Sequence, residues 1–187
     1  MNIMKTKQII ATTALLVVMA IGHVSITFAL SFDDSNQAPV LPPGCEQLAP
    51  LEGNEVAYHV YAVGVQIYRW NGTAWAFVAP EAGLFANENY RGVVGSHYGG
   101  PTWETNSGSL VASSATTAIP CTPDTTAIPW LRLTALSSSG PGILDGVTYI
   151  QRINTVGGLR PTTPGTTIDE IVRIPYTAEY YFYKQEN

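Results

Sequence analysis

Charged side chains are scarce in this sequence, and the few that occur form no basic cluster. Asp, Glu, Lys and Arg together make up 12% of the 187 residues, and the formal net charge is −5. A weakly acidic chain without a run of Lys or Arg is a poor partner for nucleic acid or for an anionic lipid surface. The sequence therefore predicts neither kind of partner.

The short motifs that mark common cofactor and hydrolase sites are also missing. The sequence has no Gly-x-Gly-x-x-Gly fingerprint, no phosphate-binding loop, no Gly-x-Ser-x-Gly elbow and no His-Glu-x-x-His pair. Neither of its two cysteines has a second Cys or a His within four residues, which disfavours a zinc site. We therefore expect no nicotinamide, no other cofactor and no bound metal.

The N-terminus carries the pattern of a secretory signal peptide. Lys5 and Lys7 give a positive start, residues 9–22 form an apolar run, and Ala29 closes a small-residue cleavage site. A membrane anchor is the alternative, but the strongly apolar run is shorter than the ~20 residues that a spanning helix needs. We predict cleavage after Ala29, or two residues later, and an extracytoplasmic location, either secreted or periplasmic.

The composition divides the chain into three segments. Residues 1–29 are the predicted signal peptide, residues 30–55 a proline-rich leader, and residues 56–187 a single β domain. Several prolines prevent regular structure in the leader. No second apolar run is long enough to span a bilayer, so we expect no membrane contact after cleavage. The sequence does not indicate the oligomeric state.

The two cysteines, Cys45 and Cys121, both follow the cleavage site. In an oxidising compartment an even pair of cysteines is most simply explained by one disulfide. Lipid attachment to Cys45 is the competing interpretation, but Pro42 stands where a lipid-attachment signal has Leu. We therefore predict a disulfide that ties the leader to the β domain.

From residue 56 onward, short β-rich runs alternate with turns. Val, Ile, Thr and aromatic residues fill the runs, and no window of 11 or more residues keeps a helical apolar period. The sequence predicts an all-β fold, an antiparallel β-sandwich or barrel of short strands with little helix. Residues 79–90 are the best place for one helical turn. After the first hairpin, the predicted strands are 92–98, 102–105, 109–113, 129–136, 147–154, 171–174 and 179–183.

Asn71-Gly72, between two β-rich runs, is the strongest local turn signal in the chain. A type I′ turn needs a positive φ at both central residues, which Asn and Gly tolerate best. The dipeptide predicts a two-residue loop in which Tyr68 lies opposite Trp75. One face of the hairpin would then carry Gln66, Tyr68, Trp70, Thr73, Trp75 and Phe77.

Residues 97–104, HYGGPTWE, are the most unusual stretch of the sequence. His97, Tyr98, Trp103 and Glu104 flank a tight Gly-Gly-Pro turn, and loops between rigid strands often carry function. An imidazole and a carboxylate are the groups that general acid–base chemistry uses, and Glu81 is a second candidate carboxylate. The competing interpretation is a structural turn that buries Trp103 and leaves His97 and Glu104 apart.

Two further residues are candidates for the wall of the same site. Tyr149 and Gln151 lie two apart in a predicted strand, so they share one face of it. We predict a ligand-binding site formed by these two with His97, Tyr98, Trp103, Glu104 and Glu81.

Six ordered blocks of the sequence resemble a known family. They are GVQIY (64–68), FVAPEAGLF (77–85), HYGGPTWE (97–104), AIPWL (127–131), YIQR (149–152) and PYTAEYYFY (175–183). These blocks are similar to the hallmarks of the domain of unknown function thirty-four fifty-five, over roughly residues 50–184. The resemblance implies a secreted protein of bacteria or fungi with no established activity and no agreed catalytic residues. Some members carry an automatic malate dehydrogenase label, for which this sequence lacks the glycine fingerprint.

Two classes of function follow from these observations. The first is a binding module for a glycan or a small apolar ligand, which the aromatic residues on short strands favour. The second is a small secreted hydrolase or lyase that uses His97 with Glu81 or Glu104. The two classes differ in one geometric feature, which is whether these side chains contact one another.

Overall fold

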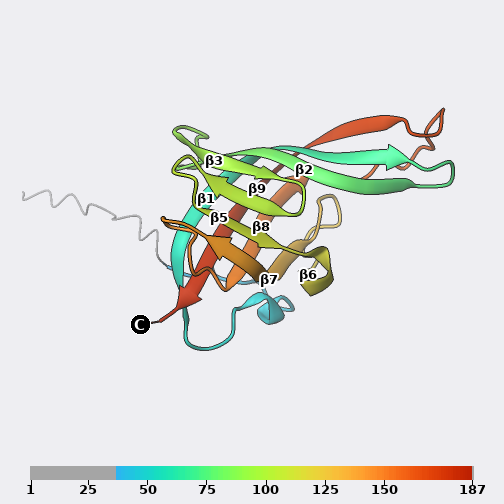
Figure 1. Cartoon of the computed structure of the whole chain (residues 1–187). Helices are drawn as coiled ribbons and strands as arrows, with labels where there is room; N and C mark the ends of the chain where they lie inside the picture. Colours follow the sequence, from blue (N-terminus) through green and yellow to red (C-terminus); the bar gives the residue numbers. More distant parts are fainter. Residues whose placement is uncertain (1–36, 187) are drawn as a thin grey trace, which may run out of the picture. The chain divides into compact units, whose positions relative to one another are not determined.

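The computed structural model describes residues 37–186. The predicted signal peptide lies outside these residues. The described part of the chain forms one antiparallel nine-stranded sheet, which confirms the all-β prediction (Figure 1). The strands are β1 (Asn54–Trp70), β2 (Trp75–Phe85), β3 (Val93–Tyr98), β4 (Thr102–Thr105), β5 (Leu110–Ser113), β6 (Ile119–Cys121), β7 (Trp130–Ser139), β8 (Tyr149–Gly157) and β9 (Ile171–Gln185). Two short 3₁₀ turns accompany them, η1 (Glu46–Leu48) and η2 (Ala115–Thr117).

The sheet closes on itself, so of the two predicted architectures the chain adopts the barrel. The strand order is β5-β4-β3-β2-β1-β9-β8-β7-β6, and β5 also pairs with β7. The closing pairs include Val111 opposite Ser138. The short strand β6 pairs only with the first part of β7, through residues such as Ile119 opposite Arg132. Closure leaves β3, β4 and β5 with a neighbour on both sides, which removes their free edges.

The interior of the barrel holds the main hydrophobic core. Side chains alternate between the two faces of each strand, so every second residue points inward. Larger rings such as Trp103 and Phe182 fill one part of the interior, while Ala62 and Ala82 leave room beside them. The buried members of this core are Val60, Ala62, Ala82, Leu84, Trp103, Val111, Ile128, Leu133, Leu144, Val147, Ile150, Tyr176, Ala178, Tyr180 and Phe182.

The leader, residues 37–53 of the described chain, lies against the outer face of the sheet. Leu48 and Cys45 are almost fully buried there, and the Gln151 Nε2 donates a hydrogen bond to the Leu48 carbonyl at 2.9 Å. A second small core of Val56, Ile153, Tyr181 and Tyr183 lies on the same outer face, with Leu41 of the leader packed against it. The leader is therefore a packed part of the domain.

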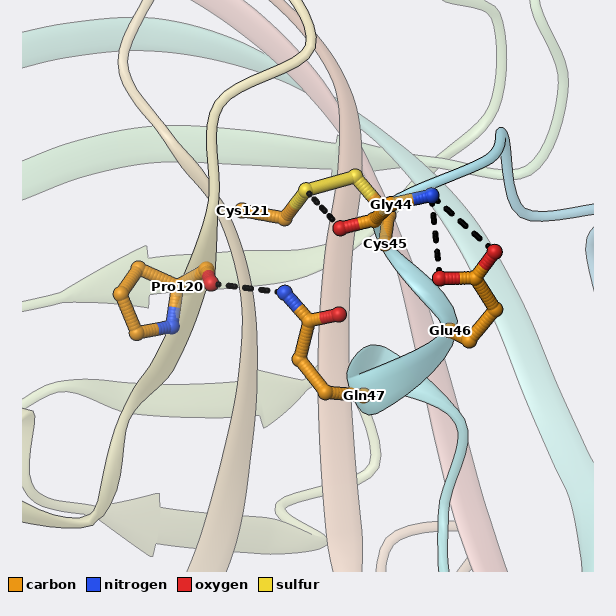
Figure 2. Close-up of a disulfide and its surroundings, with 6 residues drawn as sticks. All are labelled: Gly44, Cys45, Glu46, Gln47, Pro120 and Cys121. Carbon is orange, nitrogen blue, oxygen red and sulfur yellow. Dashed lines mark hydrogen bonds between the residues drawn. A yellow bond between two sulfur atoms is a disulfide. The ribbon is translucent and has the colours of Figure 1, made fainter.

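The predicted disulfide between Cys45 and Cys121 is confirmed (Figure 2). Their Cα atoms lie 5.5 Å apart, a separation typical of disulfides. Beside the bond, Gln47 Nε2 donates to the carbonyl of Pro120 at 3.3 Å. The bond therefore fixes the leader to the strand β6 side of the barrel.

Three strands extend beyond the barrel and form an arm (Figure 1). We define the arm as residues 65–70 of β1, 75–81 of β2 and 171–175 of β9, because these residues pair only with one another. Pro80 and Pro175 both lie in it and pair with β1, while no backbone N–H is required of either on its other side: β2 has no second strand there, and Pro175 only accepts a bond, from the N–H of Gly158. Such edges tolerate a residue without an N–H group.

The predicted hairpin is present, but its register is wrong by two residues. Trp70 pairs with Trp75 and Tyr68 with Phe77 rather than with Trp75. Asn71 N–H bonds the Ala74 carbonyl, so the central residues of the turn are Gly72 and Thr73 rather than Asn71 and Gly72. The side chain of Asn71 decides this, because its Oδ1 accepts bonds from the N–H groups of Thr73 and Ala74. A shift of two leaves Tyr68, Trp70, Trp75 and Phe77 on one face.

Two other local predictions are wrong. Residues 79–85 are part of strand β2 rather than a helical turn, because they pair with residues 61–67 of β1. Residues 171–174 and 179–183 belong to one strand, β9, rather than two. In both places the pairing with a long neighbouring strand outweighs the local preference of the segment.

Replacing Gly72 by Val should destabilise the hairpin by about 1–2 kcal/mol, because the φ of Gly72 is 93° and a β-branched residue resists positive φ. Space is not the obstacle, since an added Cβ would lie 3.4 Å from the nearest atom of Ile168. The measurement is the free energy of unfolding by urea. Gly72→Asn is the matched control, because Asn tolerates this φ, and equal losses in the two variants would contradict the argument.

Candidate functional site

The β3–β4 hairpin divides the predicted site between the two faces of the sheet. His97 pairs directly with Trp103, and both side chains point into the barrel, where their rings stack at 4.3 Å with 7° between the planes. Tyr98 and Glu104 point outward, and the Tyr98 hydroxyl donates to Glu104 Oε2 at 2.7 Å. The four residues that the sequence places together therefore form an inner pair and an outer pair.

His97 is buried and neutral. Its Nδ1 lies 2.8 Å from the carbonyl oxygen of Thr102, so Nδ1 carries the proton and donates, which leaves the Nε2 lone pair unprotonated. Burial lowers the pKa of His97 to about 3, although the bond to Thr102 opposes the shift. A Tyr180 ring packs edge-on against the imidazole at 5.1 Å. The imidazole therefore remains uncharged at neutral pH.

The predicted pairing of His97 with a carboxylate is not formed. Glu104 is on the opposite face of the sheet, bonded to Tyr98. Glu81 is exposed and forms an ion pair with Arg173 of the arm at 2.6 Å. Within residues 37–186, neither carboxylate forms an ion pair or hydrogen bond with the imidazole. This geometry lacks the arrangement that general acid–base catalysis by these groups requires.

Tyr149 and Gln151 face the leader rather than the barrel interior. Gln151 Oε1 accepts a hydrogen bond from the Tyr183 hydroxyl at 3.0 Å, while its Nε2 donates to the carbonyl of Leu48. The Arg132 guanidinium lies 5.5 Å from the centre of the Tyr149 ring. The structure therefore separates these two residues from His97 and gives them contacts that hold the leader.

A cavity of about 300 Å³ lies at the end of the barrel from which the arm extends. Its rim includes residues of the arm, the β3–β4 turn and η2, and its inner end reaches the His97–Trp103 stack. Most of the lining is apolar, as in small-molecule sites, whose volumes begin near ~300 Å³. The lining residues are Gln66, Phe77, Val78, Pro80, His97, Gly100, Pro101, Trp103, Ala115, Ala118, Leu131, Leu133, Arg152 and Tyr180.

The inner end of this cavity is polar. Gln66 Nε2 and Trp103 Nε1 are buried, and neither has a hydrogen-bond partner in the described part of the chain. Arg152 and Tyr180 lie beside them in the lining. Burial raises the pKa of Tyr180, against the opposing charge of Arg152, so its hydroxyl remains protonated. Four residues of the mainly apolar lining therefore carry hydrogen-bond donors.

The family model described as "Protein of unknown function (DUF3455)" matches residues 50–184. The chain belongs to this family. No curated protein and no solved structure matches the chain significantly.

All the residues that line the cavity fall inside the matched DUF3455 region. Of these lining residues only His97 and Trp103 were predicted as site residues, and the polar residues that the prediction missed are Gln66, Arg152 and Tyr180. A signal for them exists in the sequence, because each interrupts or ends a series of inward-facing apolar positions, as Arg152 follows Ile150. The inward face can be assigned only after the register and the closure of the barrel are known.

A histidine–carboxylate pair does occur on the outer face of the DUF3455 barrel. His59 Nε2 lies 2.9 Å from Glu179 Oε2, and the imidazole stacks on Tyr181 at 4.0 Å. Glu179 Oε1 accepts a further bond from Asn154 Nδ2 at 2.8 Å. Burial raises the pKa of Glu179, but these hydrogen bonds outweigh it and the net shift is downward. The hydrogen bonds to both oxygens of the carboxylate indicate a structural role.

Two kinds of feature are absent from the described residues. No three His, Cys, Asp or Glu side chains within residues 37–186 come together as a metal site. In the same range, no helix has the length and apolar character needed to cross a membrane.

Proposed function

We propose that this chain is an exported binding protein that holds a small, largely apolar ligand inside its barrel. One observation carries the proposal, namely the cavity of about 300 Å³ with apolar walls and a few polar groups at its inner end. In small-molecule sites, apolar walls usually supply most of the affinity for the ligand, and a small number of polar groups fix its orientation.

An apolar ligand suits the cavity better than a glycan. Sugars stack on exposed aromatic faces, and Trp103 is only 1% exposed, with one face covered by His97. The rim is instead formed by Phe77, Val78 and Pro101, which offer hydrocarbon contact and few hydrogen bonds. Among the described residues no carboxylate contacts His97, so the arrangement that a hydrolase or lyase using His97 with Glu81 or Glu104 would need is not formed in this cavity.

Export is supported by two independent features. The N-terminal residues have the pattern of a signal peptide. The Cys45–Cys121 disulfide is typical of oxidising, extracytoplasmic compartments. Binding of a ligand outside the cytoplasm is therefore the proposed role.

We expect neutral apolar probes such as indole and cinnamyl alcohol to bind the mature protein, and Ala115→Trp to weaken that binding by about tenfold or more. Ala115 is an exposed residue on the cavity rim, so a Trp at this position blocks entry with little effect on the core. The measurement is isothermal titration calorimetry, with ligand-observed NMR for weak probes.

Ala86→Trp is the matched control, because Ala86 is equally exposed and does not line the cavity. Binding that is unaffected by Ala86→Trp but reduced by Ala115→Trp supports the proposal. If both variants bind the probes with the same affinity as the original protein, the probes bind outside the cavity and the proposal is contradicted.

A further inference from the structure

The donors at the inner end of the cavity indicate what kind of polar group the ligand carries. We propose that the ligand is a small carboxylic acid, bound as its anion with the carboxylate against Arg152 and its apolar body toward the rim. This inference rests on the proposed function, since it identifies the ligand class of the same cavity.

The cavity has a positive charge that no acidic lining residue balances. Arg152 is its one charged lining residue at neutral pH, because His97 is neutral and the described lining contains no Asp or Glu. The ion pairs found within residues 37–186 join other groups and do not include Arg152. A partly buried cation normally has a counter-ion, because removing a charge from water is costly.

The charge of Arg152 acts on the interior of the barrel. It opposes the burial-driven rise in the pKa of Tyr68, Tyr176 and Tyr180. It also adds to the burial that lowers the pKa of His97. The positive charge of Arg152 therefore acts on all four rings, with Arg160 contributing at Tyr68, and no carboxylate lies among the lining residues of the cavity.

The guanidinium is held in place by the backbone. Arg152 Nε and Nη2 donate to the carbonyl of Pro129 at 3.2 and 2.8 Å. These two bonds fix the plane of the group, and the guanidinium also lies close enough to the Tyr180 hydroxyl to interact with it and oppose the rise in its pKa. A donor fixed before binding loses little conformational freedom when the ligand arrives, which favours affinity.

Two further residues of the same lining carry neutral donors. The N–H groups of Gln66 Nε2 and Trp103 Nε1 are buried without hydrogen-bond partners in the described part of the chain, which is unfavourable for each group. The Gln66 amide lies close enough to the Tyr176 hydroxyl to lower its pKa slightly, but not in hydrogen-bonding geometry. A carboxylate has two oxygens with about four acceptor sites, so it can accept from a guanidinium and from neighbouring donors together.

The single cation and the apolar walls select among anions. A phosphate ester has up to two negative charges and three acceptor oxygens, and one guanidinium in apolar surroundings balances them poorly. A carboxylate has one charge and a planar shape that matches the guanidinium. Phe77, Leu131 and Leu133 then cover the hydrocarbon part of the acid.

The test compares each acid with its uncharged amide, which has nearly the same shape. We expect cinnamate and octanoate to bind on the order of 10-fold to 100-fold more tightly than cinnamamide and octanamide, as for a hydrogen bond to a charged group. Affinities are measured by calorimetry at neutral pH. Arg152→Met should remove the preference for the acid, while Arg152→Lys, which keeps the charge and is the milder change for folding, should retain part of it.

Arg91→Met is the matched control, because Arg91 is exposed and does not line the cavity. An acid preference that survives Arg91→Met and disappears in Arg152→Met supports the inference. If amides bind as well as acids, or if Arg152→Met and Arg152→Lys both keep the full preference, the inference is overturned while the proposed function stands. If no acid, amide or neutral probe binds, the proposed function fails and the inference with it.

Discussion

Replacing Cys45 and Cys121 together by Ala should lower the free energy of unfolding by about 4–5 kcal/mol, the chain-entropy value for a long closed loop. The two cysteines are separated by 76 positions, so the disulfide restricts a large part of the unfolded chain. The leader would lose its covalent tie, although Leu48 would still pack against the outer face. The measurement is urea unfolding of the mature protein, and the melting temperature should fall by on the order of 10 °C.

The same protein provides the control for this prediction. Treating the unsubstituted protein with dithiothreitol should reproduce the loss, and the double variant should not respond to the reductant. Limited proteolysis should then cut first within residues 37–53, since the leader has only its packing contacts to hold it. A double variant as stable as the oxidised protein would show that the disulfide contributes nothing to stability.

Lowering the pH from 6.5 to 4.5 should destabilise the protein through His97 by on the order of 2–3 kcal/mol. Burial lowers the pKa of His97 to about 3, whereas an unfolded histidine has its ordinary pKa of 6.5. Between pH 6.5 and pH 3 the imidazole is protonated in the unfolded chain and unprotonated in the folded chain, so the free energy of unfolding falls as the pH falls. The slope is about 1.4 kcal/mol for each pH unit below 6.5.

His97→Asn isolates this contribution, because Asn does not titrate and its Nδ2 can still donate to the carbonyl of Thr102. The free energy of unfolding of both proteins is measured across this pH range, and the difference between the two slopes is the contribution of His97. His59 is present in both proteins and cancels. The stability supplied by Glu179, whose pKa is lowered, is lost mainly below pH 4.5. Parallel slopes for the two proteins would mean that His97 is protonated inside the barrel.

Much of the fold follows from local sequence patterns. The strand from residue 102 to 105 was predicted with its observed bounds, and β3 and β5 each differ from prediction by one residue. The disulfide follows from an even pair of cysteines behind a predicted signal peptide. The hairpin register did not follow from the sequence. The side-chain oxygen of Asn71 accepts hydrogen bonds from the N–H groups of Thr73 and Ala74, and no local rule ranks this turn against a type I′ turn centred on Asn71-Gly72.

The candidate site was only partly predictable for a different reason. His97 and Trp103 do line the cavity, and a tight Gly-Gly-Pro turn does lie at its rim. Tyr98 and Glu104 are one position out of phase with them, so the pleat of the strand carries them to the outer face. A short motif thus contains residues of both faces of the sheet, and its composition alone does not show which side chains contact one another.

The sequence by itself determined the class of the protein: an all-β domain with one disulfide, within a family of unknown function. These properties depend on residue types and their spacing along the chain, so they can be predicted from local interactions alone. Only the tertiary structure decided that the sheet closes through β5 and β7, and hence which side of each strand is the interior. That closure brings Gln66, Arg152 and Tyr180 from three strands to one cavity. The reason is that pairing between distant strands determines which side chains become neighbours, and the order of the strands in the chain does not.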